Sequence, residues 1–87
     1  MNISMDYYTR KHCGLCEEGL LQINMALQEL RHLNLSLSHY DIDEDDALQE
    51  EYMMRVPVLK HGDVVVQEGN IDFVHVYDYI KSELGNI

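Results

Sequence analysis

The feature that most constrains this chain is Cys13-Gly14-Leu15-Cys16, a C-x-x-C motif between an alternating segment and a helix-like segment. These are the only two cysteines, and the only proline, Pro57, follows about forty residues later. The spacing brings two thiols within reach of each other across one helical turn. At a helix N-terminus, unpaired backbone N–H groups and the helix dipole favour the anion of the first thiol. The pattern therefore predicts a dithiol that makes and breaks a disulfide.

Length and composition predict a single domain spanning residues 1–87. The chain is 46% hydrophobic and 25% charged, and two cysteines allow only one bridge. The first residues lack the basic and apolar regions of a signal peptide, and no apolar run approaches membrane-spanning length. We therefore expect a monomer in the cytoplasm, where a C-x-x-C motif is more often catalytic or metal-binding than structural.

The charge of the chain limits its partners. The formal net charge is −10, which disfavours binding to nucleic acid or to anionic membrane surfaces. Three of the six basic residues, Arg10, Lys11 and Arg55, nevertheless lie close in sequence to Cys13 or Pro57. Chance and solubility explain this distribution as well as a function does. The functional interpretation is a local positive patch that suits thiolates or an anionic thiol substrate.

Apolar periodicity predicts seven elements. Strands are expected at 3–9, 33–42, 56–60 and 64–66, with a turn at 61–63 between the last two. A helix is expected from Cys16 to about Leu30, a second from an N-cap at Asp43 to Met54, and a third between a cap at Asn70 and Gly85. Helices after the first two strands favour parallel pairing, and the closing hairpin adds antiparallel pairs. The expected fold is α/β, β-α-β-α-β-β-α, with a mixed four-stranded sheet and helices on both faces.

Four segments carry a resemblance to a known family: Tyr7–Glu17, Tyr40–Asp43, Arg55–Leu59 and Glu68–Asp72. Over essentially its whole length, the chain resembles glutaredoxin-like members of the thioredoxin fold, and above all the short bacterial glutaredoxin-like domains. The resemblance implies a thioredoxin-like fold and a thiol–disulfide oxidoreductase. The expected substrates are mixed disulfides of proteins or of glutathione. Glutathione is a possible thiol co-substrate, and no cofactor is required.

The resemblance also implies roles for individual residues. Cys13 is the expected nucleophile and Cys16 the resolving thiol, while Pro57 is expected to be cis beside the dithiol. Val56 is expected to offer its backbone groups to a bound thiol peptide, and Lys11 to contact glutathione. The glutathione γ-glutamyl end is assigned to Gly69, Asn70 and Asp72. The full set of expected substrate-binding residues is Lys11, Gly14, Leu15, Arg55, Val56, Pro57, Gly69, Asn70 and Asp72.

Other interpretations of the cysteines stay open. A structural zinc site needs four ligands, and the chain has no second C-x-x-C motif, so we expect no metal site. A non-catalytic module that binds a partner, or a bridged [2Fe–2S] cluster, is the alternative function. Glu17 and Glu18 oppose the thiolate about as strongly as a helix terminus favours it, which predicts a moderately reactive thiol. Of the five histidines, only His12 is positioned beside Cys13 to tune its reactivity.

Overall fold

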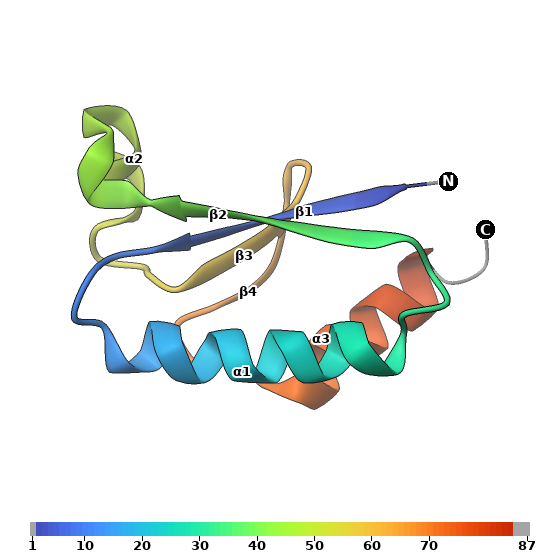
Figure 1. The fold of residues 1–87 in the computed structure, drawn as a ribbon. Coiled ribbons are helices and arrows are strands. Elements are labelled where there is room, and N and C mark those ends of the chain that lie inside the picture. Colours follow the sequence, from blue (N-terminus) through green and yellow to red (C-terminus); the bar gives the residue numbers. More distant parts are fainter. Residues whose placement is uncertain (1, 85–87) are drawn as a thin grey trace.

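A computed structural model describes residues 2–84 of the chain (Figure 1). The elements are β1 (Ile3–Thr9), α1 (Gly14–Glu29), β2 (Leu35–Asp41), the 3-10 helix η1 (Ile42–Glu44), α2 (Asp46–Tyr52), β3 (Val58–His61), β4 (Val64–Glu68), α3 (Phe73–Tyr79) and the π-helical turn η2 (Ile80–Leu84). This order confirms the expected α/β arrangement. Gly85, expected to end the last helix, lies outside the described residues.

The four strands form one mixed sheet in the order β2-β1-β3-β4. Strand β1 pairs in parallel with β2 and antiparallel with β3, and β3 pairs antiparallel with β4. Helices α1 and α3 lie against one face, and α2 lies on the other side at the end where β2 finishes (Figure 1). The mixed four-stranded sheet with helices on both faces is therefore confirmed.

Alternation along the strands divides the core between the two faces. Ile3, Met5 and Tyr7 of β1 belong to the larger core cluster, which includes buried residues of α1 and the last helix. Val58 belongs to a smaller cluster that contains Ile42 and Tyr52 on the α2 side. Because successive strand residues point to opposite faces, the two central strands, β1 and β3, supply apolar side chains to both layers.

Two helix caps differ from the sequence prediction. Asp45, not Asp43, caps α2, and its carboxylate accepts from the N–H groups of Ala47 and Leu48. Asp72, not Asn70, caps α3 by accepting from the N–H of His75. In each case the true cap has an extended backbone just before the first helical turn, and this geometry selects one of several adjacent candidates.

The connection from α2 to β3 also differs from the prediction. Helix α2 ends at Tyr52 rather than at Met54, and β3 begins at Val58 rather than at Val56. The Tyr52 carbonyl accepts from the N–H groups of Arg55 and Val56, at 2.8 and 3.1 Å, which closes a turn in place of another helical turn. Pro57 has no N–H to donate to a sheet, so regular pairing starts after it.

The observed ends of β2 and β4 also differ from the predicted ones, because backbone hydrogen bonds set where each strand begins and ends. Strand β2 begins at Leu35 rather than at Leu33, because the N–H of Leu33 donates to the Leu30 carbonyl at 2.8 Å. Strand β4 continues to Glu68 rather than stopping at Val66, since Glu68 still pairs with Val58. The predicted turn between β3 and β4 is confirmed, and Gly62 occupies its left-handed position with a φ of 60°.

Candidate active site

The two cysteines lie at the N-terminus of α1 and form a disulfide with a Cα–Cα distance of 5.2 Å. Cys13 is the N-cap residue, and its Sγ accepts from the Cys16 N–H at 3.1 Å. Cys13 is partly exposed, whereas Cys16 is buried with 4% of its surface accessible. The fold therefore presents the first sulfur to solvent and keeps the second one behind it.

Tyr7 connects strand β1 to the cysteine turn. Its side chain is fully buried, and its hydroxyl donates to the Cys16 carbonyl at 2.7 Å. Burial raises the pKa of Tyr7 to about 12, so the phenol remains a hydrogen-bond donor throughout the physiological pH range. Gly19 leaves the space for this hydroxyl, because a Cβ atom there would lie 2.6 Å from the Tyr7 Oη atom. Sequence reasoning did not identify this contact.

The raised pKa of Tyr7 predicts a loss of stability at alkaline pH. The fold favours the neutral phenol, so its contribution is complete below pH 10, the ordinary pKa, and is lost as pH rises to about 12. Two pKa units correspond to about 3 kcal/mol of unfolding free energy. Urea unfolding between pH 8 and 12 measures this slope. Tyr7→Phe should remove the Tyr7 contribution to this slope. Burial also raises the pKa of Tyr8 and of Tyr79, and their contributions remain in the variant. Equal slopes for Tyr7→Phe and the parent would contradict the assignment.

The Val56–Pro57 peptide bond is cis, the isomer that the resemblance implies. Tyr8 pairs with Val58, which places Pro57 at the end of the sheet where β1 leads into the cysteine turn. The Pro57 carbonyl accepts from the N–H of Gly69 at 2.8 Å, and Gly69 has a left-handed φ of 78°. The Val56 N–H was expected to face a substrate but donates to the Tyr52 carbonyl instead.

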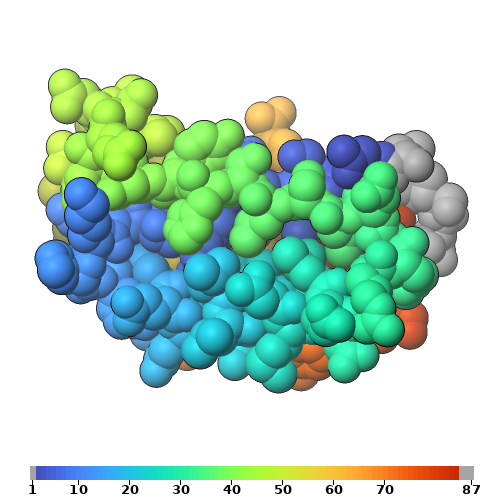
Figure 2. Space-filling model, viewed as in Figure 1, coloured from blue at the N-terminus to red at the C-terminus, as the bar shows by residue number. Residues whose placement is uncertain are grey.

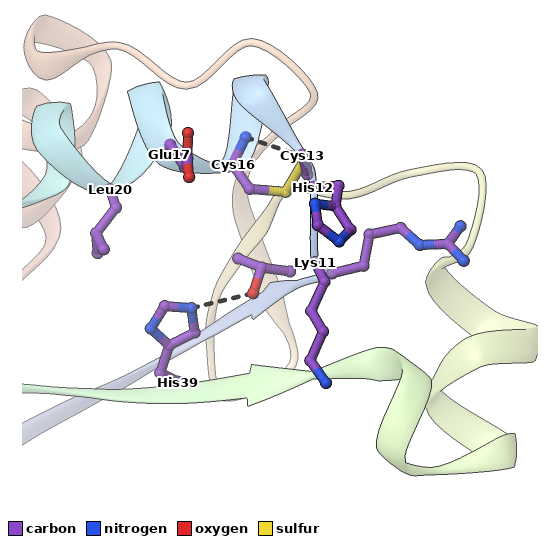
Figure 3. A pocket seen from close by; sticks show the side chains of 9 residues that line it. Lys11, His12, Cys13, Cys16, Glu17, Leu20 and His39 are labelled. Atoms are coloured by element: carbon purple, nitrogen blue, oxygen red, sulfur yellow. Dashed lines mark hydrogen bonds between the residues drawn. A yellow bond between two sulfur atoms is a disulfide. The ribbon is translucent and has the colours of Figure 1, made fainter.

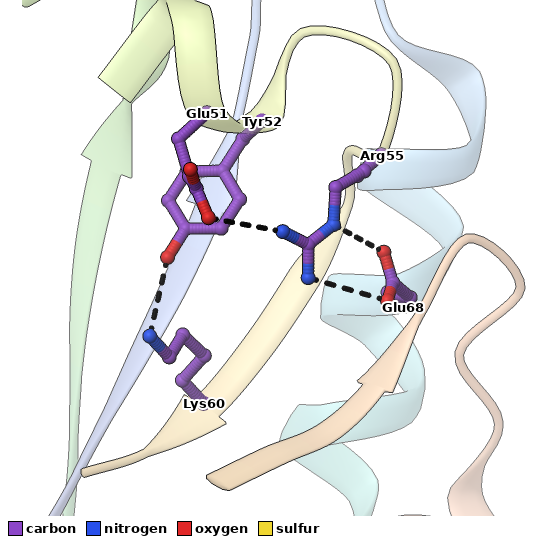
Figure 4. Close-up of polar contacts among 5 residues, drawn as sticks. All are labelled: Glu51, Tyr52, Arg55, Lys60 and Glu68. Carbon is purple, nitrogen blue, oxygen red and sulfur yellow. Dashed lines mark hydrogen bonds and ion pairs between the residues drawn. The ribbon is translucent and has the colours of Figure 1, made fainter. Parts of the chain in front are cut away.

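Arg55 was expected to bind substrate but is held by carboxylates of the protein (Figure 4). Its guanidinium donates to Glu68 at 2.8 and 3.3 Å and to Glu51 at 3.2 Å. It also lies 5.2 Å from the centre of the Tyr52 ring. Hydrogen bonding to Glu68 raises the pKa of Arg55, and the same contact lowers the pKa of Glu68. Arg55 thus ties the loop before Pro57 to α2 and β4.

A cavity of about 380 Å³ adjoins the disulfide (Figure 3). Of the expected site residues, it contains Cys13, Cys16 and Lys11. Its other lining residues are Thr9, Arg10, His12, Glu17, Leu20 and His39. The Thr9 hydroxyl lies 3.0 Å from His39 Nε2, which joins the ends of β1 and β2 beneath the cavity. His39 lies in this cavity because β1 and β2 pair in parallel, as the sequence predicts, with His39 opposite Tyr7.

The remaining expected residues lie elsewhere. Leu15, Asn70 and Asp72 line a second cavity of about 300 Å³ between α1 and the segment before α3. The Asp72 carboxylate caps α3, and the hydrogen bond from the His75 N–H lowers its pKa. Gly14 has open space around it, with nothing within 4 Å of the position of a Cβ atom. The structure therefore divides the expected substrate-binding residues between separate surfaces.

The expected positive patch is partly neutralised. Arg10 forms an ion pair with Asp43 at 3.1 Å, and Glu17 lines the same cavity as Lys11. The loop that carries Arg10 and Lys11 lies at the same end of the molecule as α2 (Figure 2).

Within residues 2–84, no group of three or more His, Cys, Asp or Glu side chains is arranged to hold a metal ion. None of the helices in this part of the chain has the length and apolar character needed to cross a membrane.

Comparison with known sequences places the chain in a family. Residues 6–82 match the family described as Glutaredoxin-like domain (DUF836). The chain belongs to this glutaredoxin-like family. Its fold and its C-x-x-C pair support a redox role for this glutaredoxin-like domain. None of the curated proteins matches the chain.

Solved structures similar to this glutaredoxin-like domain have the thioredoxin fold. The target protein XcR50 from X. campestris is 26% identical, with a TM-score of 0.66, and the match covers 90% of this chain and 96% of that one. A mutant thioredoxin from Halobacterium salinarum is 25% identical, with a TM-score of 0.59 and coverage of 93% and 74%. Thioredoxin-2 of the malaria parasite is 15% identical, with a TM-score of 0.67 and coverage of 94% and 84%, and shows the fold alone.

Proposed function

We propose that this glutaredoxin-like domain is a thiol–disulfide oxidoreductase that reduces mixed disulfides of proteins or of glutathione. The observation that carries the proposal is the Cys13–Cys16 disulfide at the N-terminus of α1. Cys13 is the more exposed sulfur, and a helix N-terminus favours a thiolate at this position. Cys13 is therefore assigned as the nucleophile and the buried Cys16 as the resolving thiol.

The reaction consists of two exchanges. The Cys13 thiolate attacks one sulfur of the substrate disulfide, forms a mixed disulfide and releases the first substrate thiol. The Cys16 thiolate then attacks Cys13 Sγ and releases the second thiol. The dithiol supplies both electrons, and the resulting Cys13–Cys16 disulfide is reduced again by an external thiol. The hydrogen bond from Tyr7 to the Cys16 carbonyl holds the resolving residue in its turn during this cycle.

The first experiment asks whether the disulfide forms reversibly in solution. Mild oxidation of the reduced protein should remove both thiols from reaction with an alkylating label, and dithiothreitol should restore them, because the spacing of Cys13 and Cys16 allows a bridge. Intact mass spectrometry reads the number of labels and excludes dimers linked between chains. A pair that remains fully labelled after oxidation would contradict the dithiol mechanism.

The second experiment measures substrate class. A titration against glutathione redox buffers gives the reduction potential and shows whether glutathione forms an adduct with Cys13. Reduction of insulin, with dithiothreitol as electron source, is compared with reduction of a glutathione mixed disulfide. Activity in either assay supports the proposed reaction and names its substrate. Absence of activity in both, together with a reversible Cys13–Cys16 disulfide, would favour a non-catalytic binding module.

A further inference from the structure

The backbone at His12 has an unusual conformation. Its φ is 58°, and it is the only residue other than glycine with a positive φ within residues 2–84. The left-handed region costs an ordinary residue about 1–2 kcal/mol, and glycine adopts it without this cost. Residues held in such conformations cluster at active sites and other functional segments. His12 directly precedes Cys13, so the chain keeps an imidazole where a glycine would relieve the backbone.

The side chain of His12 lies beside the disulfide. Figure 3 shows its ring next to the Cys13–Cys16 bond, and all three residues line the same cavity. The cavity also contains His39 from β2, but the Thr9 hydroxyl holds Nε2 of that ring at 3.0 Å. Within the described residues, the ring of His12 has no such hydrogen bond to a protein group. His12 is therefore the imidazole of this cavity that is available to exchange protons with the sulfurs.

The other charged groups of the cavity define the electrostatic setting of His12. Arg10 and Lys11 come from its own loop, and Glu17 comes from α1. Arginine and lysine are protonated at neutral pH and accept no proton, while an ordinary carboxylate is already ionised and too weak a base for a thiol. An imidazole both donates and accepts protons between pH 5 and 8. This property distinguishes His12 from Arg10, Lys11 and Glu17; His39 is also an imidazole, but its Nε2 is held by the Thr9 hydroxyl.

We propose that His12 is an acid–base group of the dithiol exchange, an inference that rests on the proposed oxidoreductase function. In the reduced protein, the His12 imidazolium pairs with the Cys13 thiolate. Once Cys13 attacks the substrate disulfide, the departing thiolate takes the imidazolium proton and leaves as a thiol. Neutral His12 then accepts the Cys16 proton, and the Cys16 thiolate attacks Cys13 Sγ. The second substrate thiolate takes this proton back from His12. Two thiol groups are thereby oxidised to one disulfide, and one substrate disulfide becomes two thiols.

The test uses His12→Asn and His12→Gly. Asparagine tolerates a left-handed backbone and does not titrate, and glycine removes both the ring and the steric cost. His32→Asn is the matched control, because His32 is exposed and lies just beyond the C-terminal end of α1, at the opposite end of that helix from the disulfide. Thermal unfolding establishes that each variant is folded. The readouts are the iodoacetamide alkylation rate of Cys13 in a Cys16→Ser background and insulin reduction, both from pH 5 to 9.

Both His12 variants should lower the Cys13 alkylation rate near pH 6 by about three- to tenfold, the contribution of one exposed charge at contact distance. The ratio to the parent should approach one near pH 9, where imidazole is neutral. In the parent, the alkylation rate of Cys13 should rise with pH in two steps, one for His12 and one for Cys13, and in the His12 variants it should rise in one. Insulin reduction by the variants near pH 6 should fall by at least the same factor as alkylation. His32→Asn should keep the parent profile.

Three results separate the two proposals. Parent activity with unchanged pH profiles in both His12 variants would overturn the role of His12 and leave the oxidoreductase function intact. A loss that is equal at pH 6 and pH 9 would also overturn it, because a merely structural role changes the rate at every pH. A parent protein with no disulfide reduction at any pH would instead overturn the proposed function.

Discussion

Cys16→Ser is expected to accumulate a stable mixed disulfide at Cys13. The variant retains the exposed N-cap thiol but lacks the buried thiol that completes the exchange. After incubation with glutathione disulfide, intact mass should show one glutathione adduct on nearly every molecule. With a protein disulfide as substrate and no free glutathione present, reduction should stop after a single event per enzyme molecule. The reason is that the substrate remains bonded to Cys13 when no second thiol attacks that sulfur.

Cys13→Ser provides the matched control, because it removes one sulfur from the same turn and leaves the other. Cys16 is buried, and its carbonyl is held by Tyr7, so its thiol should form little adduct under the same conditions. Denaturation before exposure to glutathione disulfide should remove the difference, since the contrast comes from the fold. Equal adduct formation by the two folded variants would show that the assigned roles of the cysteines are wrong.

Gly19→Val is expected to destabilise the protein by about 2–3 kcal/mol, the upper part of the usual range for overpacking a core. A Cβ atom at this position would lie 2.6 Å from Tyr7 Oη and 3.4 Å from the Ile71 Cβ atom. Tyr7 cannot easily yield, because its rigid ring is fully buried and its hydroxyl is bonded to the Cys16 carbonyl. Urea unfolding at pH 7 measures the change in unfolding free energy.

A control and a double-mutant cycle isolate the cause. Gly14→Val lies in the same helix with open space around it, so its stability should stay within about 0.5 kcal/mol of the parent. In a Tyr7→Phe background, which lacks the clashing oxygen, Gly19→Val should cost less than it does alone. Additive effects of the two substitutions would refute a direct contact between Tyr7 and position 19.

The sequence determined those features of the protein that depend on neighbouring residues. Alternation of Ile3, Met5 and Tyr7 was sufficient to predict β1, because period two matches a half-buried strand. The C-x-x-C spacing between a strand and a helix predicted a disulfide at the start of α1, and this is observed. The element order then predicted the mixed sheet, since short connections and right-handed crossovers allow few alternatives.

Helix starts were less well determined by the sequence. Asp41 is the last residue of β2, and Asp43 and Asp45 follow it closely; any of the three is chemically able to cap a helix. Asp41 caps η1 and Asp45 caps α2, because the chain makes a short 3-10 turn first and only then turns into the longer helix. The side chains of these aspartates are identical, so the sequence does not distinguish them. In the structure, Ile42 lies between the two caps and packs in a buried cluster with Tyr52 of α2.

Only the tertiary structure decided which distant residues share a site. Strand register places His39 in the cavity beside the disulfide. The Asp72 carboxylate caps α3, and Glu68 binds Arg55, which lies thirteen residues earlier in the chain. Alternation places Tyr7 on the buried face of β1, but only the structure shows that its hydroxyl donates to the carbonyl of Cys16. Such pairs arise because packing two layers against a sheet fixes distances between residues far apart in the chain, whereas periodicity reports only which face each residue occupies.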